Sequence, residues 1–215
     1  MSSDKPADKG EAMDQYSNLD ELSRDFLKEL GNIGTGNAVT SLSHMLMEPV
    51  DIEVPGLQIM KYQDCCSLLR SAEELMTGIM VGVNGDVKGV FLFLLDETFT
   101  MAVLDNVLGV EERNLLSLNE MERSLICEMG NIMCGSYIGA LSAVLDLKMD
   151  VTVPALSVDM GLALLSAPVT HYLRLSEDIL VIDNLFRLGG KAFTGRILFL
   201  PEPEALERML RRLGE

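Results

Sequence analysis

The chain has 215 residues, 48% of them hydrophobic, and a formal net charge of −16 at pH 7. A chain of this length and hydrophobic content can bury a substantial core, in one large domain or two small ones. Its 33 acidic residues outnumber its 17 basic ones. This balance argues against nucleic acid or an anionic membrane as a partner, because both attract lysine and arginine.

The first 16 residues are polar and acidic without an apolar period, and we predict a disordered tail there. They do not resemble a signal peptide, and no apolar run in the chain approaches 18 residues. The cysteines include no Cys-x-x-Cys pair, so they are interpreted as free thiols rather than metal ligands. The four are Cys65, Cys66, Cys127 and Cys134. We therefore expect a cytoplasmic protein without a metal site of its own.

The first half of the chain, residues 17–110, is predicted to begin with a long helix. Ser17 or Asn18 can cap this helix, which is expected to end near Met47, just before a Glu-Pro pair. Apolar alternation, turn residues and a capping Asp then predict the remaining elements of this half. These are the extended segments 50–55 and 57–62, a hairpin of 76–83 and 87–95, and a helix over 98–108.

The second half, residues 117–215, is predicted to repeat this order of elements. Ser117 and Glu120 have the spacing of a capping box before an apolar run, and the helix that follows is expected to end near Leu145. The segment 161–170 fits either a helix or a strand. The other predicted elements are the extended segments 151–154 and 156–158, a hairpin of 179–188 and 192–200, and a closing helix over 201–213.

The two long helices share a pattern of residues at a constant offset of 99 positions. In each half a short polar residue is followed by Glu four positions later. Asn follows three positions after this Glu, and Pro follows 23 positions after the Asn. The pattern is carried by Asp25, Glu29, Asn32 and Pro55 in the first half, and by Ser124, Glu128, Asn131 and Pro154 in the second. An internal repeat of this kind indicates a duplicated fold.

At about 100° per residue, the first three positions of each pattern lie within an arc of about 60° on a helix. They form a polar stripe next to an apolar face, which includes Ile33 and Met121 and is expected to be buried. Gly36 and Gly135 continue the two stripes. A glycine inside a helix costs about 1 kcal/mol relative to alanine, so this pair indicates room for a partner surface. The simplest interpretation of a single polar stripe is that it faces solvent. Exposure to solvent does not explain why both halves have the same residues at the same spacing, so we interpret the stripes as functional.

These residues resemble the signature of the CheC family, phosphatases that act on the phosphorylated chemotaxis response regulator CheY. The resemblance rests on (Asp or Ser)-x3-Glu-x2-Asn with its later Pro, and on Gly-Asn-Ile at 31–33 and 130–132. It extends over about residues 18–215. We expect a single α+β domain with pseudo-two-fold duplication, in which helices pack on antiparallel strands, and the resemblance implies the same fold.

Hydrolysis of an aspartyl phosphate needs a water molecule in line with the phosphorus and stabilisation of the transferring group. A neutral amide can accept a hydrogen bond from this water and donate one to a phosphoryl oxygen. We therefore expect Asn32 and Asn131 to position the water, as the resemblance also implies. Glu29 and Glu128 are expected to pair with a lysine of the regulator. The other predicted partner contacts are Asp25, Ser124, Gly36 and Gly135.

The resemblance also has implications for cofactors and partners. It places the catalytic Mg²⁺ on the response regulator, so this chain needs no cofactor of its own. It implies two protein partners, phosphorylated CheY and the receptor-modifying deamidase CheD. Pro55 and Pro154 are interpreted as structural residues that fix strand or turn geometry beside each helix.

Two alternatives stay open from the sequence. The first is a non-catalytic response-regulator-binding module of the flagellar motor-switch type, against which the intact Glu and Asn of both copies argue. The motor-switch family FliY has a similar motif with a further C-terminal domain, whereas this sequence ends at Glu215 after the closing helix, which favours the stand-alone type. The second is an unrelated hydrolase with Glu29 and Glu128 as a carboxylate pair, which requires the two carboxylates to lie about 5–10 Å apart.

Overall fold

The computed structural model describes residues 21–171 and 175–213, so the predicted tail of residues 1–16 lies outside the described part. Both predicted halves form, each with a long helix, strands, a hairpin and a final helix. The elements are α1 (Glu21–Leu46), β1 (Asp51–Lys61), η1 (Tyr62–Leu68), β2 (Leu75–Gly85), β3 (Gly89–Asp96), α2 (Glu97–Leu108), η2 (Leu115–Ser117), α3 (Glu120–Leu145), β4 (Met149–Val151), β5 (Ala155–Met160), α4 (Gly161–His171), β6 (Asp178–Leu188), β7 (Lys191–Pro201) and α5 (Pro203–Leu213).

The strands form one curled antiparallel sheet in the order β1-β6-β7-β3-β2-β4, with β5 also paired to β2. Strands β3 and β7, the second strands of the two hairpins, lie next to each other in the middle of the sheet. The two halves have equivalent positions in this order. At one edge β1 of the first half pairs with β6 of the second, and at the other edge β4 and β5 of the second half pair with β2 of the first. The duplication in the sequence is therefore a pseudo-two-fold symmetry of the fold.

The helices of the two halves also occupy equivalent positions along the chain. Helices α1 and α3 are both 26 residues long, and each is followed by an edge strand. Helix α2 follows β3 as α5 follows β7, and the short helix η1 corresponds to α4. The predicted α+β class with duplicated halves is confirmed. In the described ranges, no helix is both long and apolar enough to cross a membrane.

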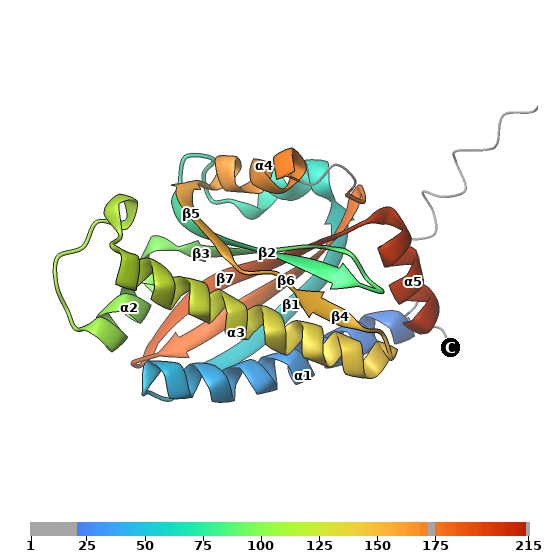
Figure 1. The fold of residues 1–215 in the computed structure, drawn as a ribbon, viewed down its shortest axis with the longest axis horizontal. Helices are drawn as coiled ribbons and strands as arrows, with labels where there is room; N and C mark the ends of the chain where they lie inside the picture. The colour runs from blue at the N-terminus through green and yellow to red at the C-terminus, as the bar shows by residue number, and fades with distance from the viewer. Residues whose placement is uncertain (1–20, 172–174, 214–215) are drawn as a thin grey trace, which may run out of the picture.

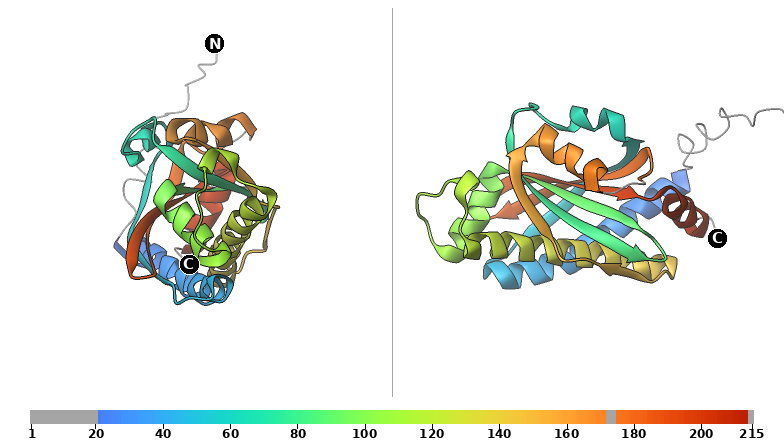
Figure 2. Two further views of the ribbon diagram at one scale, coloured as in Figure 1. Left: turned by 90° about the vertical axis from the view of Figure 1, so that its left-hand side faces the viewer. Right: turned by 45° about the horizontal axis from the view of Figure 1, so that its top comes forward.

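Both faces of the central strands are buried, which explains the uninterrupted apolar run Val90–Leu95. Phe91 and Phe93 face the cluster beneath α1, α2 and α3, whereas Leu92 and Leu94 face a second cluster beneath α4 and η1. Figures 1 and 2 show α1 and α3 on one side of the sheet and α4 with η1 on the other. A strand covered on both sides needs apolar side chains at every position rather than at alternate ones.

The predicted capping box of α3 is wrong by two residues. Asn119 rather than Ser117 caps the helix, and its Oδ1 accepts a hydrogen bond from the backbone N–H of Glu122 at 3.0 Å. The Glu122 carboxylate in turn accepts from the Asn119 N–H at 2.8 Å. Ser117 is occupied by the preceding turn η2, where its N–H donates to the carbonyl of Asn114. The segment 161–170, which the sequence left open, is helical.

Candidate functional site

The helices α1 and α3 lie side by side and run in opposite directions (Figure 1). They are in close contact at Gly34, where a Cβ atom would lie 2.8 Å from Cδ1 of Tyr137. The Tyr137 hydroxyl is 3.0 Å from Oγ1 of Thr35 and donates to Oδ1 of Asn184 at 2.8 Å. Burial raises the pKa of Tyr137 to about 12. This buried contact ties the two halves together through their motif helices.

The inner side of α3 is fixed against the sheet at Gly130. A Cβ atom there would lie 2.5 Å from Cγ2 of Ile79, so only glycine lets the helix approach β2 this closely. Met129 is buried beside it. Because successive helical residues are separated by about 100°, Glu128 and Asn131 on either side of this pair face outward, and both are exposed. In the sequence Glu-Met-Gly-Asn, the two middle residues are therefore packed against the sheet and the two outer residues are exposed to solvent.

The whole predicted stripe of the second half is exposed on α3. Ser124, Glu128, Asn131 and Gly135 all lie on the solvent side of the helix. A Cβ atom built on Gly135 would meet nothing within 4 Å. The fold therefore gives no internal reason for glycine at this position, in contrast to Gly130.

In the first half, the backbone of positions 25, 29 and 32 lies in helix α1 as predicted. The side chains of Asp25, Glu29 and Asn32 lie outside the described part of the structure. Gly36 is exposed, and a Cβ atom there would meet nothing within 4 Å. It borders a surface hollow of about 470 Å³ between α1 and β1.

The antiparallel packing separates the two Glu positions. Glu29 precedes the Gly34–Tyr137 contact by five residues along α1, and Glu128 precedes it by nine along α3. These displacements point in opposite directions, so at 1.5 Å per residue the two backbone positions are roughly 20 Å apart along the helix axes. This spacing disfavours a carboxylate pair in one cleft and agrees with two separate sites.

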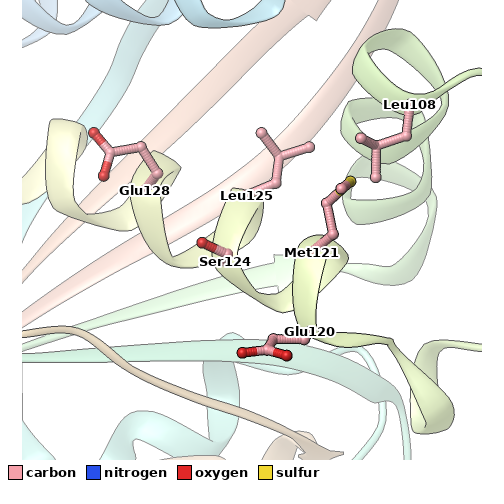
Figure 3. A pocket seen from close by; sticks show the side chains of 6 residues that line it. All are labelled: Leu108, Glu120, Met121, Ser124, Leu125 and Glu128. Atoms are coloured by element: carbon pink, nitrogen blue, oxygen red, sulfur yellow. The ribbon is translucent and has the colours of Figure 1, made fainter.

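A second hollow, of about 660 Å³, lies directly beside the stripe of α3. Figure 3 shows the six side chains that line it, with Met121 extending toward Leu108 at the end of α2. The lining residues are Leu108, Glu120, Met121, Ser124, Leu125 and Glu128. The prediction that Met121 and Ile33 are buried is wrong, since they are 67% and 41% exposed. Because this hollow borders the first turn of α3, the rest of the protein covers only part of the apolar face of the helix there.

A buried arginine, which sequence analysis missed, holds the start of α3 against the end of α2. The Arg113 side chain is 3% exposed, and its Nε donates to the Glu122 carboxylate at 2.9 Å. Its other nitrogens contact the Asp105 carboxylate and the Gly109 carbonyl. Arg113 lies in an irregular connection with exposed acidic neighbours, so no local pattern marks it as buried.

The two prolines mark breaks at the edges of the sheet. Pro55 lies where the β1–β6 register shifts between Glu53 and Gly56. Pro154 lies between β4 and β5, at the corresponding place of the second half. These positions agree with a structural role. Among the residues that the structure describes, no group of three or more His, Cys, Asp or Glu side chains could hold a metal ion.

The two motif helices and their edge strands are the parts of the chain that match a known family. The model of the CheC-like family matches residues 22–59 and again residues 121–158. Each match contains one complete Glu–Asn pattern together with its proline. Both halves of the chain are therefore similar to the CheC-like family.

Comparisons with individual proteins agree with this similarity. The chain is 25% identical to the CheY-P phosphatase CheC of Bacillus subtilis over 206 residues, which cover 94% of the chain and 99% of that relative. It is 27% identical to the flagellar motor switch phosphatase FliY of the same organism over 141 residues, 65% of the chain but 36% of FliY. The crystal structure of Thermotoga maritima FliY has the same fold, with a TM-score of 0.72 at 21% identity, covering 92% of this chain and 98% of that one.

Proposed function

We propose that this chain hydrolyses the aspartyl phosphate of phosphorylated CheY, with one Glu–Asn pair on α1 and one on α3. The observation that carries the proposal is the exposure of Glu128 and Asn131 on either side of a buried, fixed Met-Gly pair. The first half has the similar sequence Glu-Leu-Gly-Asn at residues 29–32, at the same offset. Similarity over nearly the full length to the CheY-P phosphatase of Bacillus subtilis supports the choice of substrate.

In the proposed reaction, Asn32 and Asn131 place the attacking water. Attack on phosphorus in line with the leaving aspartate requires one water orientation, and a fixed amide supplies it without an added negative charge. The amide oxygen accepts a hydrogen bond from the water, and the amide nitrogen donates one to a phosphoryl oxygen. Asn131 is suited to this because its helix is held to the sheet at Gly130, so the helix need not rearrange to present the amide.

Glu29 and Glu128 are proposed to dock the regulator through a lysine near its phosphorylation site. One helical turn separates each Glu from its Asn, so the pairing fixes where the amide enters the partner's site. Ser124 and Asp25 are proposed to contact the edge of the partner. Gly36 and Gly135 are proposed to let its surface approach closely.

The cofactor and the further partner also belong to the proposal. The Mg²⁺ ion that neutralises charge on the phosphoryl group is proposed to be bound by the regulator. CheD is retained as a second protein partner on the basis of the resemblance alone, with no residues assigned. A cytoplasmic location is proposed together with this substrate.

The test is phosphate release from phosphorylated CheY with the wild type, Asn32→Ala, Asn131→Ala and the double variant. Asn131 is exposed, and an exposed substitution away from special backbone geometry changes the free energy of unfolding by less than about 0.5 kcal/mol. Circular dichroism checks that every variant folds. Each single variant should retain activity through the other half. The double variant should bind phosphorylated CheY but lose nearly all acceleration, whereas Glu29→Ala with Glu128→Ala should weaken binding.

The possible results separate the alternatives. Near-native turnover in the Asn double variant would contradict the water-positioning role. A wild type that binds phosphorylated CheY without accelerating phosphate loss would be a binding module of the motor-switch type. Complete loss in one single variant would mean that only that half is catalytic.

A further inference from the structure

The hollow beside the stripe of α3 has an apolar floor and an acidic rim. Leu108, Met121 and Leu125 supply the apolar surface. Met121 is 67% exposed although its side chain is large and apolar. Glu120 and Glu128 supply carboxylates, and no Lys, Arg or His is among the six lining residues. An exposed apolar surface rimmed by charge is typical of a site where another protein binds.

The walls of this hollow are held in place before any partner arrives. Leu108 is the last residue of α2, and the other five lining residues belong to the first turns of α3. Arg113 joins these two elements through Asp105 of α2 and Glu122 of α3, with its own side chain almost fully buried. A pre-formed hollow reduces the conformational cost of binding.

The hollow is continuous with the proposed catalytic site, since Ser124 and Glu128 line it and also belong to the stripe. Its acidic rim favours a partner with basic side chains. A second copy of this chain is disfavoured as occupant, because two acidic rims would meet on molecules that each carry a net charge of −16.

We propose that this hollow is a specificity pocket of the second site, which receives an apolar side chain flanked by a basic one on the surface of the phosphorylated response regulator. This inference rests on the proposed function. Glu128 pairs with the basic group while Met121 and Leu125 cover the apolar side chain. The pocket thus contributes to affinity and partner choice, and the amide of Asn131 contributes to the rate.

The test uses the full chain with Asn32→Ala, so that only the second site turns over. In this background Met121→Glu should raise KM for phosphorylated CheY at least about tenfold, because an apolar contact is replaced by a buried charge. The kcat value should change less than about twofold, because the amide is untouched. Met121→Leu should keep KM within about twofold. Met121 is exposed, so these variants should fold.

Matched controls locate the effect. Val144→Glu changes another exposed apolar residue of α3, in its last turn, and should leave KM unchanged. In the Asn131→Ala background, where only the first site turns over, Met121→Glu should have no effect. Glu120→Gln should raise KM about threefold at low salt and less at high salt, because a rim charge acts mainly by screened attraction.

The outcomes distinguish this inference from the function on which it rests. If the wild type does not accelerate phosphate release, both are overturned. If it does, but Met121→Glu leaves KM unchanged, the pocket is overturned and the phosphatase stands. If Met121→Glu changes the oligomeric state in light scattering without changing KM, the occupant is a second copy and the proposal is wrong.

Discussion

At the scale of single residues, two glycines of α3 have opposite environments. Gly130 faces β2, where a Cβ atom would lie 2.5 Å from a methyl group of the fully buried Ile79. Gly135 faces solvent with nothing within 4 Å of the same atom. Glycine has a low helix propensity at both positions, but only at Gly130 does packing within the fold explain why a larger residue is absent. We propose that Gly135 leaves room for a partner that binds the stripe.

The first prediction compares Gly130→Ala with Gly135→Ala. Gly130→Ala should lower the free energy of unfolding by about 1–3 kcal/mol, because the buried Ile79 side chain must move. Gly135→Ala should raise it by about 0.5–1 kcal/mol through better helix propensity. Urea denaturation measures both. Equal effects of the two substitutions would mean that the helix does not approach β2 this closely.

The second prediction concerns close approach of the partner. Gly36→Leu combined with Gly135→Leu should abolish binding of phosphorylated CheY while circular dichroism and melting temperature stay near those of the wild type. The leucine side chains have space in the free protein and would collide only with a docked surface. The double alanine variant is the matched control and should bind more weakly than the wild type but measurably. Unaltered binding in the double leucine variant would rule out close approach.

At the scale of elements, the connection between α2 and α3 is held by one buried ion cluster. Arg113 contacts Asp105, Glu122 and the carbonyl of Gly109, and Glu122 also closes the capping box of α3. Removing the cation would leave the Glu122 carboxylate, 6% exposed, without its partner. Such a cluster fixes the direction in which α3 leaves its N-terminus, and so the direction of its stripe.

The third prediction is that Arg113→Met lowers the free energy of unfolding by about 3–5 kcal/mol, because it leaves an unpaired buried charge. Adding Glu122→Gln should restore part of this loss. Arg187→Met is the control, since its ion pair with Glu53 is exposed and should contribute less than about 1 kcal/mol. Chemical denaturation of the wild type and these three variants measures the differences. A small effect of Arg113→Met would show that the connection can repack without the cation.

At the scale of the whole molecule, the two halves are joined through the buried cluster beneath α1, α2 and α3, where Tyr137 of α3 contacts Gly34 of α1. That core buries groups that resist ionisation. Burial raises the pKa of the Cys134 thiol from 9.0 to about 12, and that of the Tyr137 hydroxyl from 10.0 to about 12. Both groups lie on the inner side of α3, so their ionisation requires loss of the packing that joins the halves.

The fourth prediction follows from the sign of these shifts. Above pH 9 the unfolded chain loses protons that the folded chain retains, so the free energy of unfolding should fall as pH rises from about 9 toward 12. Below pH 9 these groups contribute no pH dependence, since they are protonated in both states. Thermal unfolding across pH 7–11 measures the slope, which should be shallower in Cys134→Ala. An identical slope in that variant would contradict a buried, protonated thiol.

The sequence by itself determined the local elements and the repeat. Helix periodicity, capping residues and turn glycines are set by contacts a few residues apart, so α2 with its Asp96 cap and the hairpin at 189–190 follow from local physics. The constant offset of 99 positions predicted both Glu–Asn pairs, because the same residue types recur at the same spacing. The hairpin predicted for 76–83 and 87–95 forms as β2 and β3.

Only the tertiary structure decided how these elements meet. The antiparallel contact at Gly34 and Tyr137 separates the two Glu positions, and it depends on residues that are 103 positions apart. The buried Arg113 and the hollow at Met121 likewise depend on how the end of α2 meets the start of α3. Helical periodicity says which side of a helix is apolar, but which part of that side is covered depends on packing between distant segments. For this reason the sequence revealed the two stripes, and the fold revealed the hollow beside one of them.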